Sequence, residues 1–344
     1  MKVAMIGTGF IVHEALKCLN DLPIDVGAIY AKHNIQAAKD LQDQYHIPQV
    51  YTNYDQLLQE TDCDVVYIGL VNTAHYEYAK KAVLANKHVI VEKPFCIHAN
   101  QSQEIITLAK QRKLFVFEAV RPLHTPNFQQ LRKDIHKIGQ IKCIQCNYSQ
   151  YSSRYDKYKK QEVLPALDPK FYGGALYDIN VYNLNFVVSL FGKPKSVSYQ
   201  ANMGFNGVDT SGTVLLTYSD FYAICTGAKD SESPGHAIIQ GDNGTIVLDD
   251  GANLIQGYHL CIRNQKPQDI YLNTQSNWMA HEFLDFKEML ENGKLFRNIT
   301  KRNGNIRSSH CDHSLWSIKK IGPEFSFRSF FYRKLHLYMF NSIF

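Results

Sequence analysis

The sequence lacks the long apolar runs and the disulfide framework that mark several classes of protein. No stretch of about 18 consecutive apolar residues occurs, so we expect no membrane-spanning helix. The eight cysteines form no disulfide framework, and Cys143-x-x-Cys146 lies in a segment that alternates like a strand, which points its two thiols to opposite faces. We therefore expect reduced thiols and no bound metal. An apolar strand follows Met1 at once, so we expect no signal peptide and a cytoplasmic protein.

Positive charge is scarce in most of the chain, although the net charge is +5 at pH 7. Residues 294–344 contain ten Lys and Arg against two Asp and Glu, which leaves a net charge of −3 for residues 1–293. Because most of the chain is mildly acidic, its charge does not indicate a general nucleic-acid partner. Residues 294–344 also lack helical or strand periodicity. They are open to three interpretations: an interaction tail, a membrane-contacting segment, or a reading-frame shift near residue 294. We favour the frame shift because the character of the sequence changes abruptly just after a well-formed helix.

The first 120 residues alternate between short apolar runs and amphipathic segments. This order predicts an α/β domain with a doubly wound parallel sheet over residues 1–120. The expected strands lie near 2–6, 25–30, 64–70, 87–91 and 114–118. The expected helices lie near 10–20, 34–45, 73–86 and 99–112.

The character of the sequence changes after residue 120. A helical stretch is expected over 128–138, and long alternating segments follow, near 141–151, 195–203, 211–218, 221–228 and 236–240, with more strand-like pieces from 245 to 272. A helix near 175–190 interrupts them, and a last amphipathic helix is expected from Met279 to Glu291, ending at Asn292-Gly293. Residues 121–293 are therefore predicted to form an α+β substrate and dimerisation domain with an open, mostly antiparallel sheet.

A glycine turn joins the first expected strand to the first expected helix. It reads Gly7-Thr8-Gly9-Phe10-Ile11-Val12, which supplies two glycines of the dinucleotide fingerprint but has Val12 at the third position. Such a turn lets backbone approach a pyrophosphate and aims a helix N-terminus at it. We therefore predict that residues 1–120 form a Rossmann dinucleotide-binding domain and that residues 7–11 bind its cofactor.

The end of the second expected strand bears on the choice of cofactor. An NAD site normally has an Asp or Glu here for the ribose 2′-hydroxyl, but the sequence reads Ala31-Lys32-His33. Because a cation suits a 2′-phosphate, we predict that Lys32 binds the cofactor and that NADP(H) is preferred, with NAD(H) as the alternative.

Two further motifs carry a family resemblance. The segment Val89-Ile90-Val91-Glu92-Lys93-Pro94 ends an apolar strand in a lysine, and a later block runs from Gly173-Gly174-Ala175 through Asp178 and Tyr182 to Asn185. With these motifs, residues 1 to about 293 resemble the glucose–fructose oxidoreductase/inositol dehydrogenase (Gfo/Idh/MocA) family, and are most similar to its NADP-using, dihydrodiol dehydrogenase-like branch.

The resemblance implies a set of site residues. Lys93 would lie beside the nicotinamide ribose and the substrate hydroxyl, with Asp178 and Tyr182 facing the substrate. If 175–190 is helical, residues four apart share a face, so both side chains can enter one cleft. Asn72, His75 and Glu92 match recurring family positions and are expected at the cofactor.

The implied reaction is reversible hydride transfer between a carbinol carbon and nicotinamide C4. An unperturbed tyrosine is a poor base near neutral pH, but a neighbouring ammonium favours its ionised form. We therefore assign Tyr182 as general acid/base and Lys93 as its electrostatic partner, with Asp178 orienting the substrate hydroxyl or holding Lys93. The alternative, in which Lys93 itself transfers the proton, stays open.

The substrate wall departs from the family branch after Glu118-Ala119. The branch often has an aromatic residue followed by Arg-Phe there, whereas this chain reads Val120-Arg121-Pro122-Leu123-His124. If Arg121 and His124 line the cleft, they would suit a hydroxyl-rich or anionic substrate; the alternatives are that either binds the cofactor phosphates or lies outside the cleft. Asn185 is a further candidate. We therefore expect an oxidoreductase acting on a sugar, polyol or dihydrodiol-like small molecule, as a homodimer without a nucleic-acid or membrane partner. A dinucleotide-sensing regulator without turnover and an inactivated family member are the competing hypotheses.

Overall fold

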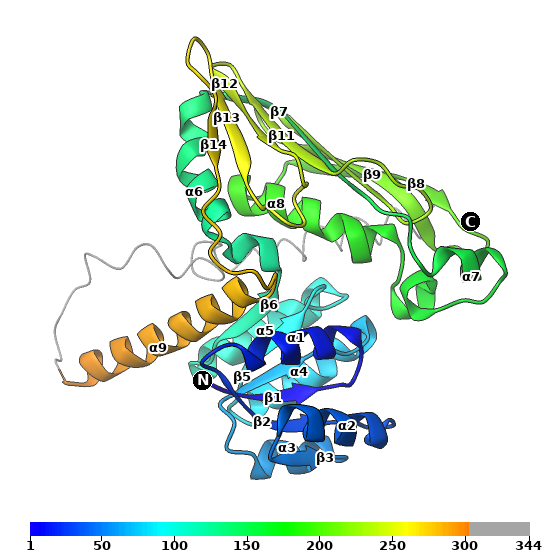
Figure 1. Ribbon diagram of the computed structural model, residues 1–344, viewed down its shortest axis with the longest axis vertical. Coiled ribbons are helices and arrows are strands. Elements are labelled where there is room, and N and C mark those ends of the chain that lie inside the picture. Colours follow the sequence, from blue (N-terminus) through cyan, green and yellow to red (C-terminus); the bar gives the residue numbers. More distant parts are fainter. Residues whose placement is uncertain (303–344) are drawn as a thin grey trace.

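The computed structural model describes the backbone of residues 1–302 and the side chains of residues 1–292. Two lobes, each built on one β-sheet, are stacked along the long axis of the molecule (Figure 1). The first lobe holds a six-stranded sheet and the second an eight-stranded sheet. This arrangement confirms the predicted fold class, a Rossmann domain followed by an α+β domain.

All six strands of the first sheet are parallel, in the order β3-β2-β1-β4-β5-β6. Apolar clusters cover both faces of this sheet, which explains why its strands read as continuous apolar runs. The strands are β1 (Lys2–Ile6), β2 (Asp25–Tyr30), β3 (Gln49–Tyr51), β4 (Val65–Ile68), β5 (His88–Glu92) and β6 (Val116–Ala119). The main connecting helices are α1 (Phe10–Asn20), α2 (Ile35–Tyr45), α3 (Tyr54–Glu60), α4 (His75–Leu84) and α5 (Ala99–Arg112).

Two short elements of this domain, β3 and α3, were not expected from the sequence. A three-residue strand such as β3 is too short to show periodicity. Helix α3 spans less than two turns, and its start depends on Asn53, whose side chain accepts a hydrogen bond from the amide of Gln56 at 3.1 Å. Strand β3 is stabilised by its parallel pairing with β2.

The second sheet has the order β14-β13-β12-β11-β7-β10-β9-β8 and is antiparallel except between β7 and β10. Helices α6 (Pro126–Asp134) and α8 (Val181–Phe191) cover one of its faces (Figure 1). The strands are β7 (Ile141–Ser149), β8 (Ser196–Met203), β9 (Asp209–Thr217), β10 (Tyr222–Ala228), β11 (His236–Gly241), β12 (Gly244–Leu248), β13 (Tyr258–Ile262) and β14 (Gln268–Ile270).

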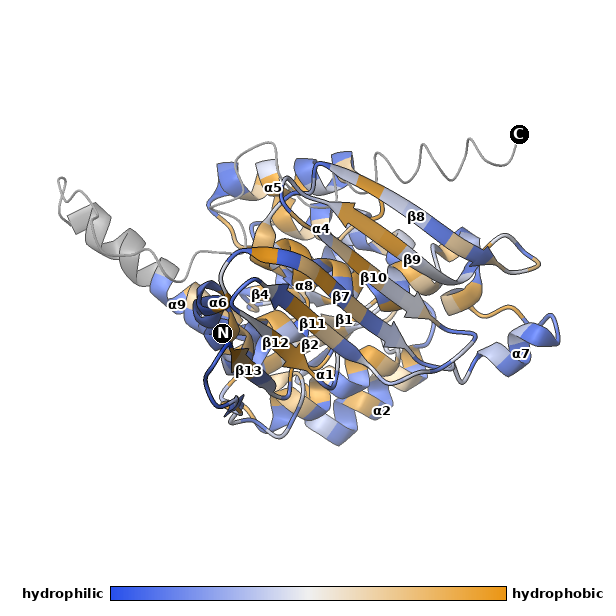
Figure 2. Ribbon diagram, turned by 90° about the horizontal axis from the view of Figure 1, so that it is seen from above, coloured by the Kyte–Doolittle hydropathy of each residue, from blue (hydrophilic) through white to orange (hydrophobic). Residues whose placement is uncertain are grey.

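In the part of the chain that the structure describes, no helix covers the opposite face of the second sheet. Figure 2 looks onto this face and shows hydrophobic residues among polar ones along its strands. Leu215 and Tyr222 are 38% and 46% exposed, whereas their neighbours in sequence, Leu216 and Ala223, are buried against the helices. The strands therefore alternate between a core side and an open side, as antiparallel strands with one packed face do.

The last helix returns to the first domain. Helix α9 (Ala280–Arg302) packs through Phe283 and Phe286 onto Tyr67 of β4 and Phe117 of β6, with ring centroids 5.7 Å and 4.5 Å apart respectively. The predicted end at Asn292-Gly293 was wrong, because the helix continues to Arg302. A glycine inside a helix costs only about 1 kcal/mol, so Asn-Gly is compatible with continuation. Residues 303–344, most of the segment assigned to a frame shift, lie outside the described residues.

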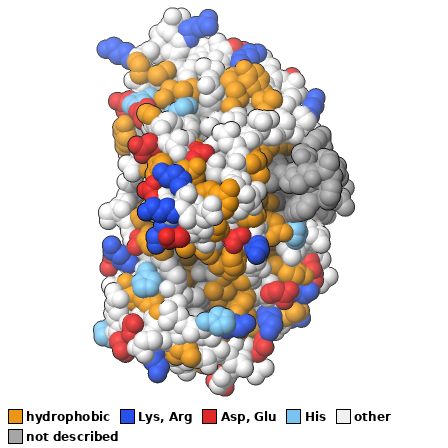
Figure 3. All heavy atoms as spheres, turned by 90° about the vertical axis from the view of Figure 1, so that its right-hand side faces the viewer, with side chains coloured by type: hydrophobic (Ala, Val, Ile, Leu, Met, Phe, Trp, Pro, Cys, Tyr) orange, Lys and Arg blue, Asp and Glu red, His pale blue; other side chains and the backbone are white. Residues whose placement is uncertain are grey.

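Charged side chains are mixed over the surface shown in Figure 3, where Lys and Arg lie among Asp and Glu and hydrophobic side chains gather across the middle. No helix in the described part of the chain has both the length and the apolar character needed to cross a membrane.

Candidate active site

The glycine turn leaves a helix end free for a ligand. Gly7 has a φ of +112°, and a Cβ there would lie 2.8 Å from the carbonyl oxygen of Gly69, so a larger residue is excluded. Gly9 is the N-cap of α1, no side chain caps this helix, and a Cβ on Gly9 would meet nothing within 4 Å. Phe10, which is 71% exposed, and half-buried Ile11 begin the helix. Backbone amides at such an uncapped start suit a phosphate.

The structure explains how the chain tolerates Val12 in place of the third glycine. A Cβ built on Gly69, directly after β4, would lie 2.6 Å from Cγ2 of Val12. Strand β4 is paired with β1. Helix α1 therefore still packs closely against the sheet, but the residue without a side chain is Gly69 after β4 and not the third residue of the glycine turn. Val12 itself is fully buried.

Lys32 lies at the carboxyl end of β2, where the second strand of a dinucleotide fold meets the adenosine ribose. It is exposed and borders a hollow of about 410 Å³. Lys81 of α4 borders the same hollow and is paired with Asp55 at 2.8 Å. The hollow is otherwise lined by Tyr30, Thr52, Asn53, Tyr54, Glu77 and Tyr78.

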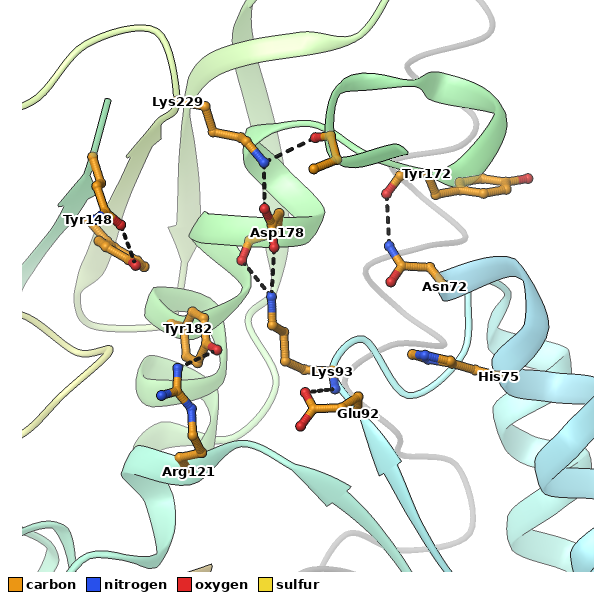
Figure 4. Close-up of polar contacts among 12 residues, drawn as sticks. Asn72, His75, Glu92, Lys93, Arg121, Tyr148, Tyr172, Asp178, Tyr182 and Lys229 are labelled. Carbon is orange, nitrogen blue, oxygen red and sulfur yellow. Dashed lines mark hydrogen bonds and ion pairs between the residues drawn. The ribbon is translucent and has the colours of Figure 1, made fainter. Parts of the chain in front are cut away.

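Asn72 and His75 connect loops around the site. The amide of Asn72 donates to the carbonyl oxygen of Tyr172 at 3.1 Å, which links the two domains (Figure 4). His75 is fully buried, and its two ring nitrogens lie 2.7 Å and 3.0 Å from the carbonyl oxygens of Pro94 and Leu70. This histidine therefore fixes the loop that carries Lys93 to the loop that follows β4.

Glu92 is buried beneath the turn that presents Lys93. Its carboxyl group accepts hydrogen bonds from the hydroxyl of Tyr67 at 2.7 Å and from the amide of Lys93 at 3.2 Å. Burial raises the pKa of Glu92, against the opposing effects of Tyr67 and Lys93. Its contacts make it a support for the Lys93 backbone.

Lys93 and Asp178 meet across the domain boundary. The ammonium of Lys93 lies 2.8 Å from Oδ1 of Asp178 and 2.9 Å from the carbonyl oxygen of Asp178. Burial alone would lower the pKa of Lys93, but the Asp178 carboxylate outweighs burial and raises it. Burial would raise the pKa of Asp178, but Lys93 and then Lys229 hold it well below its usual range. Both groups are therefore charged.

The position of Asp178 depends on local helix geometry. Asp178 lies in a π-helical turn, η6 (Leu176–Asn180), that leads directly into α8. The turn begins where the amide of Leu176 donates to Oδ2 of the Asp209 carboxyl at 2.6 Å. Asp209, at the start of β9, thus caps the N-terminus of this helical turn.

Tyr182 lies one turn further on, beside the same ammonium. The Lys93 nitrogen is 5.2 Å from the centroid of its ring, so the structure brings together the three residues assigned to catalysis (Figure 4). Arg121 donates a hydrogen bond of 2.8 Å to the Tyr182 hydroxyl. The Arg121 guanidinium also stacks 3.8 Å above the ring of Trp278, which fixes its orientation.

The other residues predicted at the substrate wall have different surroundings. Nδ1 of His124 lies 2.5 Å from a carboxylate oxygen of Asp285 in α9, and its ring packs edge-on against Phe286. Asn185 donates to the carbonyl oxygen of Val181 in its own helix at 2.9 Å. Of the predicted wall residues, Arg121 is the one with a hydrogen bond to the Tyr182 hydroxyl.

Sequence reasoning missed three residues of this group. Lys229 pairs with Asp178, Trp278 stacks on Arg121, and Tyr148 of β7 packs edge-on against Tyr182 at a centroid distance of 6.0 Å. Burial raises the pKa of Tyr148. Each lies far along the chain from the motifs, and no local pattern distinguishes it from the other lysines, tryptophans and tyrosines.

Comparisons with known proteins agree with this architecture. A family model described as "Oxidoreductase family, NAD-binding Rossmann fold" matches residues 1–120, and one described as "GFO/IDH/MocA C-terminal domain" matches residues 128–247. The fold and the matched models define a nicotinamide-dependent oxidoreductase with a Rossmann domain and an α+β domain. The chain belongs to the Gfo/Idh/MocA family, which confirms the family recognised from the sequence motifs.

Similar proteins are dehydrogenases and reductases. The chain is 32% identical over 296 residues to the scyllo-inositol 2-dehydrogenase (NADP(+)) IolU of Bacillus subtilis, covering 86% of this chain and 90% of that protein. It is 29% identical over 255 residues to the trans-1,2-dihydrobenzene-1,2-diol dehydrogenase of Xenopus tropicalis, covering 72% and 74%. A levoglucosan dehydrogenase bound to NADH and levoglucosan shares the fold, with a TM-score of 0.75, 17% identity and coverage of 85% and 90%.

Proposed function

We propose that this protein is a cytoplasmic, NADP-preferring oxidoreductase that transfers hydride between nicotinamide C4 and a carbinol or carbonyl carbon of a sugar or polyol. The observation that carries the proposal is the convergence of Lys93, Asp178 and Tyr182 from two domains, with the Lys93 ammonium 5.2 Å from the Tyr182 ring. The similarity to IolU, named for scyllo-inositol and NADP(+), supports the polyol substrate and the cofactor.

The residues of the first domain fit a nicotinamide dinucleotide. Gly7, Gly9 and the uncapped start of α1 would hold the pyrophosphate, with Thr8, Phe10 and Ile11 alongside. The open space at Gly9 leaves room for such a group. When bound, the nicotinamide supplies the acceptor or donor of the hydride.

The remaining chemistry is movement of the hydroxyl proton of the substrate. Tyr182 is assigned as the acid/base. Its hydroxyl oxygen accepts a hydrogen bond from the Arg121 guanidinium at 2.8 Å, and a cation this close stabilises the negative charge left on the phenol when it gives up its proton. Lys93 stabilises charge on the substrate oxygen. Both carboxylate oxygens of Asp178 are occupied by lysines, so we assign it to holding Lys93.

Turnover of a polyol tests this function. The full chain would be assayed for NADP+ reduction with scyllo-inositol, myo-inositol, levoglucosan and trans-1,2-dihydrobenzene-1,2-diol, and for NADPH oxidation with the matching ketones. Turnover of at least one sugar or polyol supports the proposal. Tight dinucleotide binding with no turnover on the panel would instead favour the regulator.

The cofactor preference is tested at Lys32. Because an exposed lysine at the end of β2 can pair with a 2′-phosphate but not with a ribose hydroxyl, Lys32→Ala should raise the KM for NADPH about tenfold and leave that for NADH within about twofold. Lys39→Ala, on an exposed position of the neighbouring helix α2, is the matched control. A wild-type preference for NADH contradicts the assignment.

A further inference from the structure

Lys229 is a buried lysine, directly after β10, that the proposed mechanism does not use. Its side chain is 2% exposed. Its ammonium pairs with Oδ2 of Asp178 and donates to the carbonyl oxygen of Ala166 at 3.0 Å. Asp178 is therefore shared between two lysines, with Oδ1 facing Lys93 and Oδ2 facing Lys229 (Figure 4).

The second lysine changes the charge of the site. Lys93 and Asp178 alone form a neutral pair, in which the carboxylate cancels much of the field of the ammonium. With Lys229 added, the three groups carry a net charge of +1. The other titratable or charged groups facing them come from five elements: Glu92 of β5, Arg121 of η2 (Arg121–His124), Tyr148 of β7, Tyr182 of α8 and Asp209 of β9.

We propose that Lys229 is a positioning residue that neutralises and holds Asp178, so that the positive charge of Lys93 stays available to the reacting oxygen. The inference rests on the proposed function, because it deepens the role of the same site. Lys229 contacts neither Lys93 nor Tyr182 through a hydrogen bond, and it acts through Asp178.

The size of the effect follows from Coulomb's law at the effective dielectric constant of a partly buried site. An unbalanced carboxylate several ångströms from the reacting oxygen opposes the negative charge that forms there. Removing Lys229 should therefore lower kcat about 10- to 100-fold, with KM changed by less than about threefold.

Lys229→Met in the full chain tests the proposal, because methionine replaces the lysine stem without its charge. Lys195→Met, on an exposed position just before β8, is the matched control. Three measurements are made: kcat and KM with NADP+ and scyllo-inositol against pH, fluorescence titration with NADP+ and with NADPH, and thermal unfolding. The variants Lys229→Arg, Asp178→Asn and Lys229→Met/Asp178→Asn are measured alongside.

The expected results separate an electrostatic role from a structural one. In Lys229→Met the pH at which oxidation reaches half its maximal kcat moves upward. NADP+, whose nicotinamide is positively charged, gains affinity relative to NADPH. Lys229→Arg restores part of kcat, and removing the Asp178 carboxylate in the double variant makes the loss smaller than the sum of the single losses.

Two outcomes would overturn the inference, and one separates it from the proposed reaction. A lower melting temperature with an unchanged pH curve and an unchanged NADP+/NADPH affinity ratio means that Lys229 only supports the fold. An altered affinity ratio without turnover by the wild type supports the role of Lys229 while defeating the proposed reaction. Absence of binding of both dinucleotides by the wild type overturns the proposed function and this inference with it.

Discussion

At the scale of single residues, the site is built from charges that balance one another across the domain boundary. Asp178 stays ionised because Lys93 and Lys229 face its two oxygens. Tyr182 differs, because its hydroxyl receives a hydrogen bond from Arg121 and its own proton can be donated to a substrate oxygen. A hydroxyl group placed beside cations is suited to moving one proton reversibly.

Replacing Tyr182 by phenylalanine should reveal this role. The variant keeps the ring beside Lys93 and removes the proton, so kcat should fall by about 10²–10⁴ with dinucleotide affinity kept. Steady-state kinetics and fluorescence titration measure the two quantities. Tyr148→Phe, which changes a neighbouring ring that packs against Tyr182, should lose far less. Full activity in Tyr182→Phe would transfer the acid/base role to Lys93.

Asp209 should make stability depend on pH. Burial raises its pKa to about 6, so the folded state binds more protons than the unfolded one between the ordinary value and pH 6. Stability from this group is fully present below pH about 4 and is lost as pH rises through 6, by about 3 kcal/mol.

The variant Asp209→Asn isolates this contribution. Its amide oxygen can still accept from Leu176 and from Tyr199, which both donate to Oδ2 at 2.6 Å. Urea denaturation at pH 4 to 8 should show the variant gaining stability relative to wild type as pH rises. A difference between the two proteins that stays constant with pH would show that Asp209 has an ordinary pKa in the fold. The lowered pKa of Asp178 is common to both proteins and cancels.

At the scale of elements, Gly69, directly after β4, allows α1 to pack closely against the sheet although the glycine turn lacks its third glycine. Because a Cβ at Gly69 would lie 2.6 Å from Val12, Gly69→Ala should destabilise the fold by about 1–3 kcal/mol. The double variant Val12→Ala/Gly69→Ala should recover part of this loss. Denaturant unfolding measures both.

Gly9→Ala supplies the contrast for that prediction. A Cβ at Gly9 meets no protein atom within 4 Å, so stability should change by less than about 1 kcal/mol while dinucleotide affinity falls. Equal destabilisation by Gly9→Ala and Gly69→Ala would refute the packing argument.

The elements that the sequence predicted well are those with a strong local pattern. Strands β1 and β2 and helices α1 and α5 begin and end where their apolar runs and caps indicate. Strand β3, with three residues, and helix α3, with seven, were not predicted because each repeats its pattern fewer than two full times. The end of α9 was misplaced because Gly293 permits helix termination without requiring it.

At the scale of the whole molecule, the open face of the second sheet is the surface through which we propose that two copies associate. Leu215 of β9 and Tyr222 of β10 are 38% and 46% exposed, on paired strands whose opposite face is covered by helices. Light scattering after size exclusion should give about twice the monomer mass. Leu215→Glu/Tyr222→Glu should shift the protein towards the monomer, because burying two carboxylates in such an interface is unfavourable. A wild type that stays monomeric at high concentration would refute the dimer.

The site itself required the meeting of two domains and the C-terminal helix. Lys93 and Asp178 were recognisable from motifs, and residues four apart in a helix placed Tyr182 on the same side as Asp178. The motifs could not show that Arg121 would turn to the Tyr182 hydroxyl, because its orientation depends on Trp278, which is 157 positions away in the printed sequence.

What the sequence alone determined was the fold class, the glycine turn and the lysine, aspartate and tyrosine motifs, because periodicity and special backbone positions are local properties. The tertiary structure decided which charges share Asp178, what fills the space beside Val12 and where His124 points. Those features arise from contacts between distant segments, whose energies depend on burial and distance rather than on neighbouring letters.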